Sequence, residues 1–248
     1  YTVTEDAVIT VGFAKKAVGE ENKAVTIPKS QIGNYSGTAY RLEFPEILLG
    51  DRDGGDTDRK GKSFTISTWV NFAELTGSKN EGTGDGTVIM GHGAQAHMNH
   101  NGSVFLCAKP NGKLYLGGGE NNITGRDLNA DITIDTWMYL TIVYDNDAQS
   151  VSVYKDGMIL ETVEMGHQLN LFNDDPAIFY VGGVMFSGMC DEFQYFNKAL
   201  TSDDVLTAYN DPKGIDGLTA LYDFNSIAEG TTGQFENKIK SSDKADIK

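Results

Sequence analysis

The chain of 248 residues lacks the features that mark several large protein classes. It holds only two cysteines and five prolines, and it has no run of about 18 apolar residues, which excludes a disulfide scaffold and a transmembrane helix. Basic residues are also few, with 20 Lys and Arg against 35 Asp and Glu, so the net charge is −15. Because such a surface repels phosphate, it argues against nucleic acids and anionic membranes as partners.

What is present indicates a folded β protein. Hydrophobic residues make up 40% of the chain and aromatic residues 10%, which is too many for a disordered segment. The 29 glycines, together with the few prolines, favour tight hairpins between long strands. Cys107 and Cys190 are expected to be two buried thiols, with a single bridge between them as the alternative. Since the chain begins at Tyr1 without a signal-peptide pattern, we expect a mature fragment whose targeting signal has been removed.

Alternating apolar and polar residues between turn signals predict a series of strands. The predicted strands are 7–13, 64–72, 113–117, 136–145, 178–183 and 188–196. Residues 151–164 predict a hairpin that turns at Asp156-Gly157. Its core face is expected to hold Val151, Val153, Met158, Leu160 and Val163. One short helix is predicted over 201–210, where Thr201 and Asp204 form a capping box. Many strands with almost no helix indicate a sandwich or a barrel.

Three segments, in this order, resemble the laminin-G-like jelly-roll family of the concanavalin A-like lectin/glucanase superfamily. They are KSFTISTWVNF at 62–72, the Trp-led strand with its Asp-Gly hairpin at 135–162, and the segment 179–210. The last one combines a Gly-Gly strand end, Gly-x-x-Asp-Glu, an aromatic strand and a capped helix. The resemblance covers about residues 40–210 and implies an all-β jelly-roll sandwich of two antiparallel sheets with one short helix.

The order of segments departs from that family at one place. GLTALYDFNS at 217–226 is similar to the strand that usually opens the family, yet it follows the helix. It is either a closing strand or the start of a second repeat, and we favour the closing strand because only about twenty residues follow it. We therefore predict one domain over residues 1–235 and a frayed polar tail over residues 236–248.

The resemblance also implies a structural calcium ion, which is a cofactor of many members of the superfamily. Asp191, in Gly-Met-Cys-Asp-Glu, matches the position of the ligand on the last long strand, and Asp223 is its expected partner. Ca²⁺ takes six to eight oxygens and accepts mixed carboxylate and carbonyl ligands. The alternative is that Asp191 only accepts hydrogen bonds from loop amides.

An acidic loop offers a weaker calcium site. Its four carboxylates are those of Asp51, Asp53, Asp56 and Asp58. So many close carboxylates repel one another unless a cation neutralises them. The spacing misses the EF-hand pattern, however, and Arg52, Arg59 and Lys60 supply local countercharge, so a solvated loop is the favoured interpretation.

A histidine-rich loop at 91–101 is the candidate ligand-binding loop. The side chains expected to contact a ligand are His92, His97, Asn99 and His100. They could hydrogen-bond a sugar or hold a metal, but no Cys or carboxylate lies nearby, and an ordinary polar loop remains the alternative.

Aromatic side chains bear on sugar recognition, because exposed rings stack on sugar faces. The resemblance places Trp69 and Trp137 in the core, which weakens the hypothesis of a lectin. Catalytic motifs do not appear: the chain has no Glu-x-Asp-x-x-Glu strand, Gly-x-Ser-x-Gly elbow, P-loop or His-Glu-x-x-His.

The resemblance and the missing motifs together favour a non-catalytic module that recognises carbohydrate or a protein. We expect it to be part of a larger secreted, periplasmic or cell-surface protein. A glycoside hydrolase or lyase with a dispersed carboxylate pair is one alternative, and a structural spacer is another.

Overall fold

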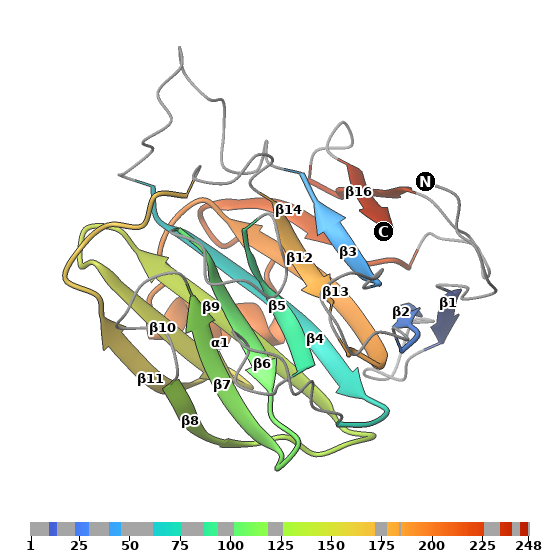
Figure 1. Ribbon diagram of the computed structural model, residues 1–248. Coiled ribbons are helices and arrows are strands. Elements are labelled where there is room, and N and C mark those ends of the chain that lie inside the picture. The colour runs from blue at the N-terminus through green and yellow to red at the C-terminus, as the bar shows by residue number, and fades with distance from the viewer. Residues whose placement is uncertain are drawn as a thin grey trace.

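The computed structural model describes residues 10–13, 23–29, 40–45, 62–75, 87–93, 102–118, 126–171, 178–183, 185–225, 234–239 and 244–247. Two antiparallel sheets pack face to face, and α1 lies on the far side of one of them (Figure 1). The predicted fold class, an all-β jelly-roll sandwich of two antiparallel sheets with one short helix, is confirmed. Within the described ranges, no helix is long and apolar enough to cross a membrane.

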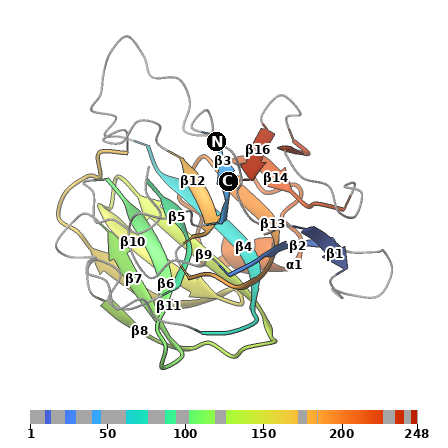
Figure 2. The ribbon, with the colours of Figure 1, turned by 45° about the vertical axis from the view of Figure 1, so that its right-hand side comes forward.

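Sheet A contains the long central strands. In spatial order it consists of β1 (Thr10–Phe13), β2 (Lys23–Ile27), β13 (Gly188–Phe196), β4 (Phe64–Phe72), β9 (Trp137–Asp145), β10 (Ser150–Lys155) and β11 (Met158–Glu164). β14 (Leu218–Tyr222) pairs with the second half of β13, and β2 pairs with the first half. β1 and β2 extend away from the other strands on one side (Figure 2). Because β14 completes this sheet, the segment after the helix is a closing strand, as predicted.

Sheet B is built from shorter strands. Its order is β15 (Gln234–Glu236), β16 (Lys244–Ile247), β3 (Arg41–Phe44), β12 (Phe179–Gly182), β5 (Thr87–His92), β6 (Val104–Ala108), β7 (Lys113–Gly118) and β8 (Arg126–Asp131). β16 pairs with β3, so the predicted frayed segment 236–248 contains a strand of this sheet. The boundary of the single domain at residue 235 stays a prediction.

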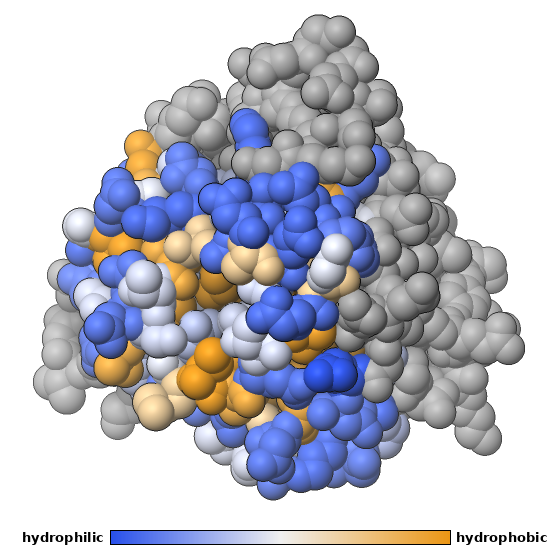
Figure 3. All heavy atoms as spheres, turned by 90° about the vertical axis from the view of Figure 1, so that its left-hand side faces the viewer, coloured by the Kyte–Doolittle hydropathy of each residue, from blue (hydrophilic) through white to orange (hydrophobic). Residues whose placement is uncertain are grey.

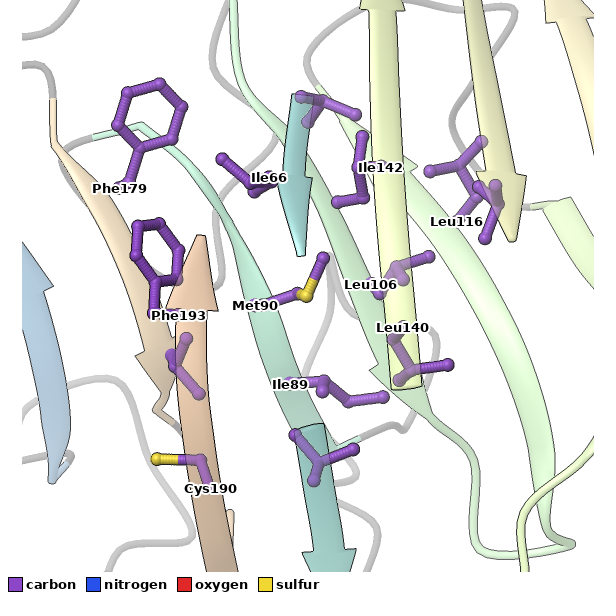
Figure 4. Packing of buried hydrophobic residues seen from close by; sticks show 14 of the residues in the cluster. Ile66, Ile89, Met90, Leu106, Leu116, Leu140, Ile142, Phe179, Cys190 and Phe193 are labelled. Carbon is purple, nitrogen blue, oxygen red and sulfur yellow. The ribbon is translucent and has the colours of Figure 1, made fainter. Parts of the chain in front are cut away.

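The core lies between the sheets and is almost entirely apolar. Ile66 and Ile142 of sheet A and Leu106 and Leu116 of sheet B point into it, and all four are fully buried (Figure 4). Burying one such side chain contributes about 1.5–3 kcal/mol, so this layer is the main stabilising element. Both cysteines are free and buried, as expected. Burial raises the pKa of the Cys190 thiol, and Asp191 raises it further.

The 151–164 hairpin forms, but its predicted core face is only partly right. Val151, Val153 and Val163 are buried, whereas Met158 is 64% exposed. The register shifts between Val153 and Tyr154, and this irregularity interrupts the alternation that the prediction carried through the turn.

Helix α1 (Ser202–Asn210) covers part of the outer face of sheet A. Its N-cap is Thr201, and the predicted capping box with Asp204 is present. The buried residues Val205 and Ala208 pack on Val143, Tyr154 and Phe196 of the sheet. This second apolar layer fixes the helix against the sandwich.

Candidate site at the loop end of the sandwich

Several strands of sheet B end together, next to the predicted ligand-binding loop. Phe44 pairs with Phe179, Phe179 with His92, and His92 with Val104. We call this edge, with the start of β4 at Phe64, the loop end. The β3–β4 and β5–β6 connections both leave from it, because each joins two strand ends that lie there.

Most of the loop candidates lie in those two connections, outside the described residues. They are Asp51, Asp53, Asp56 and Asp58 between β3 and β4, and His97, Asn99 and His100 between β5 and β6. The topology therefore starts the acidic loop and the histidine-rich loop from the same end of the molecule. Their ligand-binding and metal-binding roles stay predictions.

His92 is the one member of the histidine set that is described. Its ring is 1% exposed and lies 4.9 Å from the ring of Phe179 and 5.8 Å from that of Phe64. Its Nδ1 is 3.2 Å from the carbonyl oxygen of Gly102, so Nδ1 carries the proton in this hydrogen bond. The side chain thus joins the two ends of the histidine-rich connection from within the core.

An aromatic cluster lies on the outer face of sheet B, directly beside the loop end. We call it the outer cluster; its members are Val88, Phe105, Cys107, Tyr115 and Tyr180. Tyr180 pairs with Gly91, and Gly91 pairs with Phe105, so this row lies one residue from the His92 pair. All five side chains are at most 5% exposed, although they face away from the main core.

Charged pairs flank the outer cluster on two sides. On β3, Arg41 donates to Glu43, and across β7 Lys109 pairs with Asp127. The Lys109 Nζ also lies 4.9 Å from the centroid of the Tyr115 ring, within the range of a cation–π contact. Burial raises the pKa of the Cys107 thiol, and the nearby Lys109 lowers it less, so this cysteine stays protonated. The region therefore combines a buried apolar cluster with charged pairs at its margins.

The sequence analysis missed the outer cluster. The feature of the sequence that could have revealed it is the uninterrupted apolar run at 104–108, which indicates a strand that is buried on both faces. One such face is the core, and the other needs a second apolar layer.

Of the predicted calcium ligands, Asp191 lies on β13 and Asp223 directly follows the neighbouring strand β14 of sheet A. Phe193 pairs with Tyr222, which brings Asp191 and Asp223 to the same end of the β13–β14 ladder. Asp191 is 2% exposed, and its Oδ1 accepts a hydrogen bond from the Glu192 amide at 2.7 Å. Asp223 Oδ1 lies 3.7 Å from Lys238 Nζ.

These two carboxylates do not by themselves make a calcium site. Among the described residues, no group of three or more His, Cys, Asp or Glu side chains could hold a metal ion. Ca²⁺ would need further oxygens, and the Lys238 ammonium competes for Asp223. Calcium at Asp191 and Asp223 stays a prediction.

The placement of the two tryptophans in the core was wrong. Trp69 pairs with Tyr139 and Asn71 pairs with Trp137, while the alternate pair Val70 and Met138 points into the core. Trp69 and Trp137 therefore lie on the outer face of sheet A, and both are only half-buried. The alternation of side chains along a strand shows which residues share a face of the sheet, but the sequence did not show which of the two faces would pack against the other sheet.

Comparisons with known proteins agree with this architecture. A family model described as the concanavalin A-like lectin/glucanases superfamily matches residues 51–206. No curated protein matches the chain.

Two solved structures illustrate the likeness of fold. A candidate carbohydrate-binding protein from Bacteroides ovatus is 16% identical with a TM-score of 0.58, and the match covers 98% of this chain but 59% of the other. A heptameric SAP-like pentraxin from Limulus polyphemus is 15% identical with a TM-score of 0.50, and the match covers 93% and 96% of the two chains. At these identities the likeness shows the fold alone.

Proposed function

The chain belongs to the concanavalin A-like lectin/glucanases superfamily, and from this membership we propose that it is a non-catalytic module that recognises a glycan. The Bacteroides ovatus protein with the same fold is named as a candidate carbohydrate-binding protein, which supports this class of ligand. The observation that carries the proposal is the loop end, where Phe105 and Tyr180 of the outer cluster lie one residue from the strand ends at which two polar connections start.

In the proposed site, the connections at the loop end supply the hydrogen bonds. His97, Asn99 and His100 offer ring nitrogens and an amide for sugar hydroxyls. His92 acts by holding the connection in place, because its ring is buried against Phe64 and Phe179.

Calorimetric titration with a panel of neutral and acidic oligosaccharides tests the proposal. The unaltered chain should bind at least one of them, and the triple variant His97→Ala/Asn99→Ala/His100→Ala should lose about tenfold or more in affinity at the loop end. Asn111→Ala, in the β6–β7 turn at the opposite end of sheet B, is the control and should bind as the unaltered chain does. A chain that binds no member of a broad panel would overturn the proposal.

A second assay separates recognition from catalysis. Reducing-sugar release from the same panel should stay at the background level. Release that a single Asp→Asn or Glu→Gln substitution abolishes would replace the proposal with the glycoside hydrolase or lyase alternative.

We place this module in a larger secreted, periplasmic or cell-surface protein. The chain spans 59% of the Bacteroides ovatus protein, which supports a role as one part of a longer polypeptide. Antibody labelling of intact cells and of the culture medium tests this location; signal confined to the lysate would contradict it.

The predicted calcium ion has its own test. If Asp191 and Asp223 hold Ca²⁺, EDTA should lower the melting temperature of the chain, and added CaCl₂ should restore it. Asp191→Asn should remove that sensitivity. Equal melting temperatures with EDTA and with CaCl₂ would end the calcium hypothesis and leave the glycan proposal untouched.

A further inference from the structure

The outer face of sheet A carries a second set of aromatic side chains, at the end opposite the loop end. Trp69 lies between Asp191 and Tyr139 in one row of the ladder, and Asn71 lies between Met189 and Trp137 in the next row. The diagonal from Trp69 to Trp137 is therefore about 7–8 Å between Cα atoms. One small ligand can contact both rings.

Three of these rings hold one another in fixed positions. The ring centroid of Trp69 is 5.3 Å from that of Tyr139 and 5.3 Å from that of Tyr209, the last of which comes from α1. Tyr139 is fully buried and donates to Gln194 Oε1 at 2.6 Å. Asp156 Oδ1 accepts from the Tyr139 amide at 2.9 Å, which fixes the tip of the β10–β11 hairpin beside the rings. The arrangement is rigid before any ligand binds, so little ordering cost remains.

Helix α1 packs on only part of this face. Val205 and Ala208 cover Val143, Tyr154 and Phe196, and the helix ends at Asn210. Trp69, Trp137 and Tyr209 lie at that end of the face, and all three residues are half-buried.

Apolar surface continues from the rings onto the hairpin. Met158 is 64% and Leu206 44% exposed, and a Cβ on Gly157 would lie 2.9 Å from Leu206 Cδ1. The side of the molecule that contains β11 shows apolar residues in patches between polar ones (Figure 3).

Polar groups adjoin the rings as well. Glu192 and Asp156 are half-buried on either side of the aromatic row, and Asn210 is exposed at the end of α1. Half-buried aromatic residues, with carboxylates beside them as hydrogen-bond acceptors, suit the apolar face and the hydroxyl rim of a sugar ring. Because these acceptors are acidic and the whole chain carries −15, a uronic, sialic or sulfated glycan would be repelled.

We propose that the face formed by Trp69, Trp137 and Tyr209, the tryptophan face, is a second glycan site that takes neutral hexose oligosaccharides. The proposal rests on the proposed glycan recognition and adds a site and a ligand class to it. Stacking on the two tryptophans supplies the affinity, and Glu192, Asp156 and Asn210 accept hydroxyl hydrogen bonds at the rim.

The composition of the chain makes this site selectively observable. The chain contains two tryptophans, and both belong to the tryptophan face, so tryptophan fluorescence reports on this face alone. Fluorescence and calorimetric titrations would use cellohexaose, laminarihexaose and mannohexaose as neutral probes, and 3′-sialyllactose and tetragalacturonate as anionic probes. At least one neutral probe should change the fluorescence saturably, and the anionic probes should not.

Variants assign the signal to the face. Trp137→Ala should weaken binding of the neutral probe about tenfold, and Trp137→Phe should restore part of it, because a ring remains for stacking. Ile239→Ala, at an exposed apolar residue elsewhere, should bind normally. Circular dichroism confirms that each variant is folded. At Trp69 the variant is Trp69→Phe, because the Trp69 ring packs on Tyr139 and Tyr209 and an alanine would leave a cavity there.

The outcomes separate this proposal from the first. A neutral probe that binds by calorimetry without any fluorescence change, and with equal affinity for Trp137→Ala, would overturn the tryptophan face and leave glycan recognition standing. No binding of any probe by either method would overturn both. If Trp137→Ala instead changes the sedimentation coefficient and leaves sugar binding intact, the face is a self-association surface and the proposal is wrong.

Discussion

Two glycines determine how the outer cluster packs on sheet B. A Cβ on Gly117 would overlap the ring of Phe105, with 2.5 Å to Cζ, and the three atoms nearest to it all belong to that ring. On Gly91, a Cβ would lie 2.5 Å from the Val104 carbonyl oxygen and 2.7 Å from the Tyr180 hydroxyl. The rings of the outer cluster can lie close to the sheet because these positions carry no side chain.

This contact gives a clean test of the packing. Gly117→Ala should lower the free energy of unfolding by about 1–3 kcal/mol, because the Phe105 ring must move out of its place. In a chain that already carries Phe105→Ala, Gly117→Ala should lower the free energy of unfolding much less, because the ring atoms that would clash with the new Cβ are absent. Urea unfolding of the four chains in this double-mutant cycle measures the coupling. Equal costs in both backgrounds would show that the glycine is needed for another reason.

Buried tyrosines make the fold sensitive to alkali. Burial raises the pKa of Tyr144 to about 12 and raises the pKa values of Tyr139 and Tyr195 above the ordinary range. Because the folded state favours the neutral phenol, the stability from these groups is complete below pH 10 and is lost as the pH rises through 12. Melting temperatures from pH 8 to pH 12 should fall above pH 10. The tyrosinate absorbance measured at each step should rise in parallel, as the buried phenols become accessible and ionise.

Tyr144→Phe is the control for the alkaline effect. The variant loses the hydrogen bond that the Leu169 amide donates to the Tyr144 hydroxyl, so it should be less stable at pH 8. Between pH 8 and pH 12, the melting temperature of this variant should fall by less than that of the unaltered chain, because one buried phenol is absent. Ionisation of all tyrosines near pH 10 without unfolding would contradict the prediction.

The N-terminal cap of α1 stabilises the helix locally. Thr201 accepts from the Asp204 amide, and the Asp204 carboxylate accepts in return from Thr201, in the box that the sequence predicted. Thr201→Ala should lower the free energy of unfolding by about 1 kcal/mol, while Thr207→Ala, at an exposed mid-helix position, should cost less. Thermal unfolding measures both variants, and an equal loss would mean that the cap is not what stabilises the helix.

Elements with strong local signals were predictable from the sequence. The strand 64–72, the hairpin turn at Asp156-Gly157 and the capped helix all form where they were expected, because alternation, Asp-Gly and a capping box act within a few residues. What failed depended on distant contacts: the register shift after Val153 exposed Met158, and the position of α1 left Trp69 half-buried. The family resemblance predicted the sandwich, but it did not show that the two tryptophans would lie on the outer face of sheet A.

Net charge affects the stability of the whole molecule. With 35 acidic and 20 basic residues, the compact chain repels itself at neutral pH. The surface ion pairs, such as Lys113 with Asp131 and Arg126 with Glu161, oppose this repulsion, but exposed pairs contribute only about 0–1 kcal/mol each. The uncompensated acidic residues should therefore decide the response to salt.

The melting temperature should rise with NaCl between about 10 and 150 mM at pH 7, because the Debye length shrinks from roughly 30 to 8 Å over that range. A gain of about 1 kcal/mol corresponds to roughly 2–4 °C for a chain of this size. EDTA in every buffer removes any contribution from divalent cations. Near pH 4.5, the isoelectric point, the rise should vanish, since positive and negative charges then balance. A melting temperature that falls with salt at pH 7 would mean that the ion pairs stabilise the fold by more than the acidic excess destabilises it. The ion pair of Arg126 and Glu161, which joins the edges of the two sheets, would then matter more for stability than net repulsion.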